Sequence, residues 1–124
     1  MLDALGVPVE SQVTPFAKNS LQAELIDPKN PRALYFSDEV AVGWVRGADL
    51  LEVASHDPTQ GGVFYTLEQK PQAAPEFKRN DNCLACHLSW DTLGVPGFFL
   101  MSTLTVPDDP HSYASGFSSD HRQN

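Results

Sequence analysis

The stretch that decides the fold begins with the run Ala33-Leu34-Tyr35-Phe36-Ser37-Asp38-Glu39-Val40-Ala41-Val42-Gly43-Trp44-Val45. Residues 33–36 are apolar, residues 37–39 are turn formers, and residues 40–45 are rich in β-branched and aromatic side chains. Short runs of this composition favour strands, because branched and aromatic side chains pack well on a pleated surface. We therefore predict two strands joined as a hairpin.

Two more short strands are expected at residues 50–55 and 63–67, with Asp, Pro and Gly turn formers between them. The connections among the four strands are too short for the crossovers that parallel strands need, so we expect antiparallel pairing. Downstream, residues 80–90 can form a helix with Asn80 or Asp81 as its N-cap. The predicted fold class is α+β, an antiparallel meander with one short helix.

The chain has 124 residues, the size of one ordinary domain. We expect a lead-in segment at residues 1–31, a single domain at residues 32–107 that ends in a strand at 98–106, and a polar C-terminal tail at residues 108–124. Ten prolines argue against a bundle of long helices.

Sixteen acidic residues against eight Lys and Arg give the chain a net charge of −8. Such a field repels nucleic acid and attracts basic proteins, so a basic partner protein is expected and nucleic acid is not. No run of residues approaches the roughly eighteen apolar residues of a membrane span, so none is expected.

The chemistry is concentrated in Cys83-Leu84-Ala85-Cys86-His87, which matches the pattern for covalent attachment of a c-type haem. Residues three and four apart share one face of a helical turn. Both sulfurs can therefore reach the two vinyl groups of the porphyrin while the imidazole of His87 binds the iron. The expected cofactor is one covalent haem c with its iron, carried by a short haem-bearing helix.

The two cysteines allow three other interpretations. A zinc site needs a fourth ligand and would normally bring a second Cys or His pair, which the sequence lacks. A thioredoxin-like redox pair belongs between a strand and a long helix in a βαβ unit, which a meander does not provide. A chance pair of cysteines is the third alternative.

A ligating imidazole is nearly always oriented by a hydrogen bond from its other nitrogen, and the loop at Pro96 can supply the acceptor. The opposite side of the iron has three candidates. Met101 could offer its thioether, His56 could make a bis-histidine haem, or the sixth position could be open or hold water. Five aromatic side chains are candidates for the walls of the haem crevice, although such residues more often belong to the core: Trp44, Tyr65, Tyr35, Phe64 and Trp90.

Residues 33–45, 51–54, 62–67, 83–87 and 94–97 together resemble a group of poorly characterised bacterial cytochrome-c-like proteins. The resemblance covers most of residues 30–121. It implies a monohaem chain of the periplasm or another extracytoplasmic compartment, with a signal peptide that is not part of this sequence. It also keeps a decorated all-α cytochrome c fold as the alternative to the meander. By fold-level analogy alone, a sheet with such a motif is similar to periplasmic sensor domains of PAS-like architecture.

The first functional hypothesis is therefore electron transfer in the periplasm through covalently bound haem. The second is a haem sensor or small-ligand-binding domain with an open sixth iron position, which could act as a homodimer. An enzymatic role is less favoured, because no acid, base or substrate pocket stands out beyond the iron.

Overall fold

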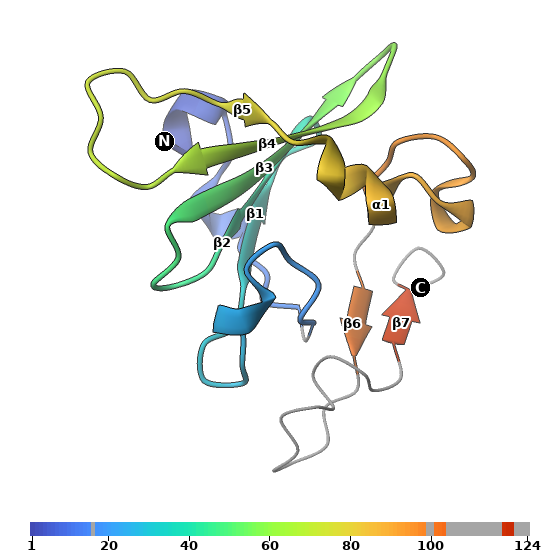
Figure 1. Ribbon diagram of the computed structural model, residues 1–124, viewed down its shortest axis with the longest axis horizontal. Coiled ribbons are helices and arrows are strands. Elements are labelled where there is room, and N and C mark those ends of the chain that lie inside the picture. The colour runs from blue at the N-terminus through green and yellow to red at the C-terminus, as the bar shows by residue number, and fades with distance from the viewer. Residues whose placement is uncertain (16, 99–100, 104–117, 121–124) are drawn as a thin grey trace.

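The computed structural model describes residues 1–15, 17–98, 101–103 and 118–120. Its centre is a five-stranded antiparallel sheet in which each strand pairs with the next along the chain (Figure 1). The strands are β1 (Ala33–Phe36), β2 (Val40–Trp44), β3 (Leu50–Asp57), β4 (Gly61–Glu68) and β5 (Lys78–Arg79).

Helical structure in the described residues is short. The single α-helix among them is α1 (Leu84–His87), which directly follows the 3₁₀ turn η4 (Asp81–Cys83). The other 3₁₀ turns are η1 (Asp3–Leu5), η2 (Val9–Ser11), η3 (Ala23–Leu25) and η5 (Trp90–Thr92). The α+β class and the antiparallel meander are confirmed, and an all-α fold does not hold for this part of the chain. No helix found there is long and apolar enough to cross a membrane.

The four predicted strands lie where the sequence indicated, within two residues at each end. The connections between β2 and β3 and between β3 and β4 contain glycines with positive φ, 82° at Gly47 and 77° at Gly61. These angles are costly for residues with a side chain. Before Gly61, the Asp57 carboxylate accepts hydrogen bonds from the Thr59 amide at 2.8 Å, the Thr59 hydroxyl at 2.7 Å and the Gln60 amide at 2.8 Å. This closes the turn between β3 and β4.

The register divides the sheet into two faces, because successive side chains along a strand point to opposite sides. One face carries Val42, Val53 and Tyr65, which are direct cross-strand neighbours. Val7 of the lead-in segment packs on Val42 and Val53 in a buried cluster, so we call this side the N-terminal face. The other side, which we call the helix face, carries Glu52, His56, Gly62 and Phe64.

Residues 1–31 reach both faces of the sheet. Val13 pairs with Leu34 at the outer edge of β1 through two backbone hydrogen bonds of 2.8 and 2.9 Å. Beyond this edge, the Glu52 carboxylate on the helix face accepts a hydrogen bond from the Leu21 amide at 2.8 Å. Arg32 forms an ion pair of 2.8 Å with the same carboxylate. The segment therefore runs from the N-terminal face, around the β1 edge, to the helix face.

Strand β5 was not predicted. The sequence indicated no strand between residue 67 and the helix predicted from residue 80, whereas Lys78 and Arg79 pair with Thr66 and Tyr65 of β4. This short strand brings the chain back along the outer edge of the sheet immediately before the cysteine motif.

The predicted helix at 80–90 is too long. Its beginning is confirmed, since the Asn80 side chain accepts a hydrogen bond from the Asn82 amide at 3.1 Å. It ends at His87 because Leu88 has φ −129° and ψ 81°, outside the helical region. The His87 carbonyl accepts instead from the Gly97 amide at 3.0 Å, a contact that draws the chain out of the helix.

The C-terminal region holds a second pair of strands, β6 (Met101–Thr103) and β7 (Ser118–Asp120), which are antiparallel. Of the strand predicted at 98–106, residues 101–103 are confirmed, Phe98 is not in a strand, and 99–100 and 104–106 lie outside the described residues. Strand β7 lies within the polar tail predicted at 108–124.

Candidate haem attachment site

The cysteine motif begins where the chain leaves the sheet. The Asn80 amide donates to the Phe64 carbonyl at 2.9 Å, which ties the start of the motif segment to β4. Asn80 then caps the turn that contains Cys83, and α1 carries Cys86 and His87. The three residues of the motif are thus placed on one short helical segment beside the helix face of the sheet (Figure 1).

Cys83 and Cys86 do not form a disulfide. Cys86 is exposed, and Cys83 is partly buried. Burial raises the pKa of the Cys83 thiol, with a further contribution from the Glu52 carboxylate. A raised pKa keeps this thiol protonated at neutral pH, whereas a thioredoxin-like redox pair needs a thiolate. The environment of Cys83 therefore speaks against that interpretation.

The His87 ring is oriented by the backbone of Gly97. Its Nδ1 lies 2.8 Å from the Gly97 carbonyl oxygen. A carbonyl only accepts, so the proton of the neutral ring is on Nδ1 and the lone pair is on Nε2. Burial lowers the pKa of His87, although the bond to Gly97 acts in the opposite direction. The ring is therefore neutral at pH 7, the form in which imidazole binds metals.

The predicted acceptor in this loop was Pro96, and the structure places its neighbour Gly97 in that role. The Pro96 carbonyl instead accepts a hydrogen bond of 2.7 Å from the Gly62 amide of β4. Successive carbonyls of an extended segment point to opposite sides. One of them therefore contacts the sheet and the next contacts His87.

Phe64 is the aromatic side chain that the sheet presents to His87. It is 7% exposed, and its ring centroid lies 4.5 Å from that of His87 with an angle of 38° between the planes. Phe98 packs edge-on against Phe64 at 5.9 Å. Phe64 thus contacts the end of α1 from the sheet, and Phe98 contacts Phe64.

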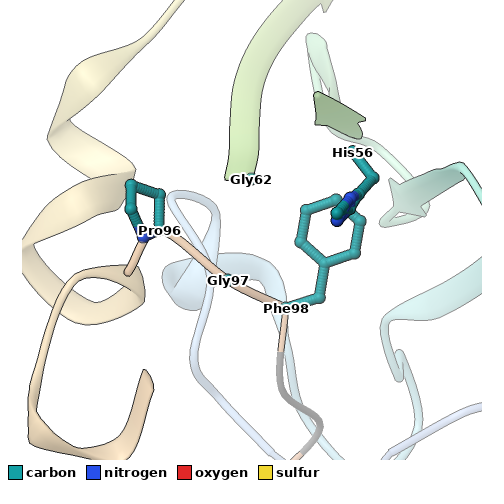
Figure 2. Close-up of a pocket in the computed structure, with 5 residues that line it drawn as sticks. All are labelled: His56, Gly62, Pro96, Gly97 and Phe98. Carbon is teal, nitrogen blue, oxygen red and sulfur yellow. The ribbon is translucent and has the colours of Figure 1, made fainter. Parts of the chain in front are cut away.

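His56 lies on the same face of the sheet but apart from His87. Figure 2 shows it beside Phe98, and the two ring centroids are 6.4 Å apart. With Gly62 and the 96–98 segment they line a hollow of about 210 Å³. Residues 96–98 bond to Gly62, the cross-strand neighbour of His56, on one side and to His87 on the other.

The remaining predicted residues are placed as follows. Tyr65 and Trp44 belong by register to the N-terminal face, and Tyr65 packs against the Val42 cluster and Phe77. The structure does not bring them to the side of the sheet that carries His87. Met101 lies in β6, and its side chain is outside what the structure describes.

The segment after the motif exposes large apolar side chains. Trp90 is 96% exposed and Leu93 is 88% exposed. Leu93 also has a positive φ of 56°, which is uncommon for residues other than Gly, Asn and Asp. Three further apolar side chains of this segment are exposed: Leu88, Val95 and Phe98. Apolar surface gathered in one segment in this way is typical of a binding site.

Sequence reasoning missed Gly97, which bonds to the His87 ring, and Gly62, which bonds to the neighbouring Pro96 carbonyl. Gly97 and Gly62 were interpreted only as parts of turns, and the signal available was their clustering with other glycines in Gly61-Gly62 and Gly94-Val95-Pro96-Gly97.

Within the described ranges, no three His, Cys, Asp or Glu side chains are grouped so that they could hold a metal ion by themselves.

The chain matches no family model, no curated protein and no solved structure.

Proposed function

We propose that this chain is a monohaem c-type cytochrome that transfers electrons in the periplasm or another extracytoplasmic compartment, like the cytochrome-c-like group that it resembles. The observation that carries the proposal is the hydrogen bond from Nδ1 of His87 to the Gly97 carbonyl, at the end of a Cys-x-x-Cys-His motif. It puts the lone pair on Nε2 and fixes the ring, as in histidines that ligate a metal.

The chemistry of the donor set fits this cofactor. Cys83 and Cys86 would form the two thioethers, and His87 would bind the iron through Nε2. The apolar side chains exposed beside the motif, Trp90 and Leu93 among them, suit contact with a porphyrin. When bound, the haem supplies reversible one-electron chemistry at iron. The residues of the chain anchor it and hold the imidazole neutral and correctly turned.

The test is expression of the chain with an exported leader in a host that carries out cytochrome c maturation. We expect haem that stays with the polypeptide after denaturation and a sharp α band on reduction. A double variant, Cys83→Ala with Cys86→Ala, is the matched control and should retain no covalent haem. The proposal fails if the parent chain, folded and exported, retains none either.

A haem sensor with an exchangeable sixth position is the second candidate function, and the placement of His56 favours it. The two imidazoles pack against different phenyl rings, His56 against Phe98 and His87 against Phe64, so His56 would have to leave Phe98 to serve as a second ligand. Carbon monoxide distinguishes the two functions. Ready binding to the reduced protein would identify a sensor or ligand-binding domain of the kind that the PAS-like analogy implies. No binding would identify a six-coordinate electron carrier, and Met101→Ala would then test its thioether as the ligand.

A further inference from the structure

The segment that carries the cysteine motif is hydrogen-bonded to one edge of β4 at both of its ends. Before the motif, the Asn80 amide donates to the Phe64 carbonyl at 2.9 Å. After the motif, the Pro96 carbonyl accepts from the Gly62 amide at 2.7 Å. Residues two apart in a strand offer their hydrogen-bonding groups to the same edge. Residues 80–96 thus leave and return at positions 64 and 62 of β4.

A side chain on β4 at the return point would crowd the atoms that pack there. A Cβ at Gly62 would lie 3.0 Å from Cε1 of Phe98, 3.2 Å from Cζ of Phe64 and 3.3 Å from the Gly97 amide nitrogen. A Cβ at Gly61 would overlap the carbonyl oxygen of Pro96. Gly61 and Gly62 therefore let the backbone at 96–97 approach the sheet closely.

The same short segment holds His87. Gly97 accepts from Nδ1 of His87 at 2.8 Å and donates its amide to the His87 carbonyl at 3.0 Å. Any displacement of Pro96 away from β4 must move Gly97, because the two residues share a peptide bond. The close packing at Gly61 and Gly62 is in this way linked to the hydrogen bond on the imidazole.

We infer that Gly61 and Gly62 are positioning residues for the axial histidine: by admitting the 96–98 segment against β4, they keep the Gly97 carbonyl on Nδ1 of His87. This inference rests on the proposed function for its effect on the haem, but its structural part concerns the polypeptide alone. A hydrogen bond at Nδ1 makes Nε2 a stronger donor to iron. Stronger donation favours the oxidised iron, so weakening this bond should raise the reduction potential.

The experiment compares Gly61→Ala with Gly47→Ala in the full chain. Both glycines have similar positive φ, 77° and 82°, but the space around Gly47 is open within 4 Å. The two variants therefore share the backbone strain, and only Gly61→Ala displaces the 96–98 segment. Gly62→Ala, with no positive φ, is a second and independent variant. In Gly62→Ala combined with Phe98→Ala, the nearest clashing ring is removed, which keeps the test open if the single variants do not fold.

Two measurements are made. In the haem-loaded chain, we expect Gly61→Ala and Gly62→Ala to raise the midpoint potential and Gly47→Ala to leave it unchanged. In the haem-free full chain, we expect NMR to show solvent exchange of the His87 Nδ1 proton about tenfold or more faster in the first two variants. The combined variant should return toward the parent.

The outcomes separate this inference from the proposed function. Unchanged exchange in Gly61→Ala and Gly62→Ala would overturn the positioning role, whether or not the chain carries haem. Equal changes in Gly47→Ala would also overturn it, because general strain would then explain them. Failure of the parent chain to acquire haem would overturn only the proposed function, and the exchange measurement would still decide the role of the two glycines.

Discussion

At His87 a backbone carbonyl decides which ring nitrogen carries the proton. The Gly97 oxygen is a fixed acceptor 2.8 Å from Nδ1, and the Phe64 ring at 4.5 Å restricts rotation of the imidazole. Burial by the same surroundings lowers the pKa of His87 and keeps the ring neutral. Orientation, tautomer and charge state of this side chain thus have one origin, its packing between α1 and β4.

Asp57 provides a prediction about pH at a single residue. Three hydrogen bonds to the carboxylate, led by that from the Thr59 hydroxyl, lower its pKa from 3.8 to about 2. A group whose folded pKa is depressed stabilises the fold above its unfolded pKa and loses that contribution as pH falls through the folded pKa. Asp57→Asn removes the charge and should destabilise the protein at pH values above about 4.

The prediction concerns the gap in unfolding free energy between the parent and Asp57→Asn. Urea unfolding at a series of pH values should show this gap narrowing below pH 3.8 and nearly closing by about pH 2. Asp38→Asn, at another exposed turn, is the control for the loss of a surface carboxylate. A gap that stays constant over this range would show that the carboxylate charge does not contribute.

At the scale of the element, the N-cap of the motif segment can be tested. The Asn80 side chain accepts from the Asn82 amide at 3.1 Å and so satisfies one of the unpaired amides at the start of η4. Asn80→Ala should lower the unfolding free energy by about 1 kcal/mol, because that amide loses its partner. Asn80→Asp is the matched control and should remain within about 0.5 kcal/mol of the parent, since aspartate caps equally well. Urea unfolding measures both, and equal stability of all three chains would exclude a capping role.

The same scale shows what sequence reasoning can predict. The four longer strands carry apolar and branched residues at short spacing, and turn-forming residues separate them, so their positions follow from local preference. Strand β5 is only Lys78–Arg79, two exposed polar residues that carry no hydrophobic pattern. It forms because the edge of β4 is available for pairing, and the local sequence around residues 78–79 does not indicate this. The early end of α1 has a similar cause, since the Gly97 amide ten residues away takes the carbonyl of His87.

The candidate site, like the fold, is predicted in part from local sequence and depends in part on contacts between distant residues. The motif Cys83 to His87 and the need for an acceptor in the loop around Pro96 can be read from spacing and residue type. Which carbonyl serves as the acceptor depends on the path of the backbone, and it is Gly97. Strand alternation predicts that Phe64 and Tyr65 point to opposite faces. It does not say which face receives the helix, and that depends on how residues 1–31 and 80–96 cover the sheet.

At the scale of the whole molecule, the lead-in segment completes the core. Val7 is 2% exposed and packs with Val42 and Val53 on the N-terminal face. Val7→Ala removes two buried methyl groups and should lower the unfolding free energy by about 2 kcal/mol. Val9, two residues on and 57% exposed, is the matched control, and Val9→Ala should change stability by less than about 0.5 kcal/mol. Equal effects in urea unfolding would mean that the segment does not stabilise the sheet through Val7.

The net charge of −8 acts on the molecule as a whole and makes a prediction for electron transfer. If the chain carries the proposed haem, its field should attract cationic reaction partners and repel anionic ones, and salt should weaken both effects. Stopped-flow oxidation of the reduced protein by a small cationic metal complex should slow several-fold between about 10 mM and about 150 mM ionic strength. An anionic complex of similar potential should show the opposite trend. Rates independent of salt for both complexes would mean that the acidic surface lies away from the point of electron transfer. The expectation of a basic partner protein would then lose its support.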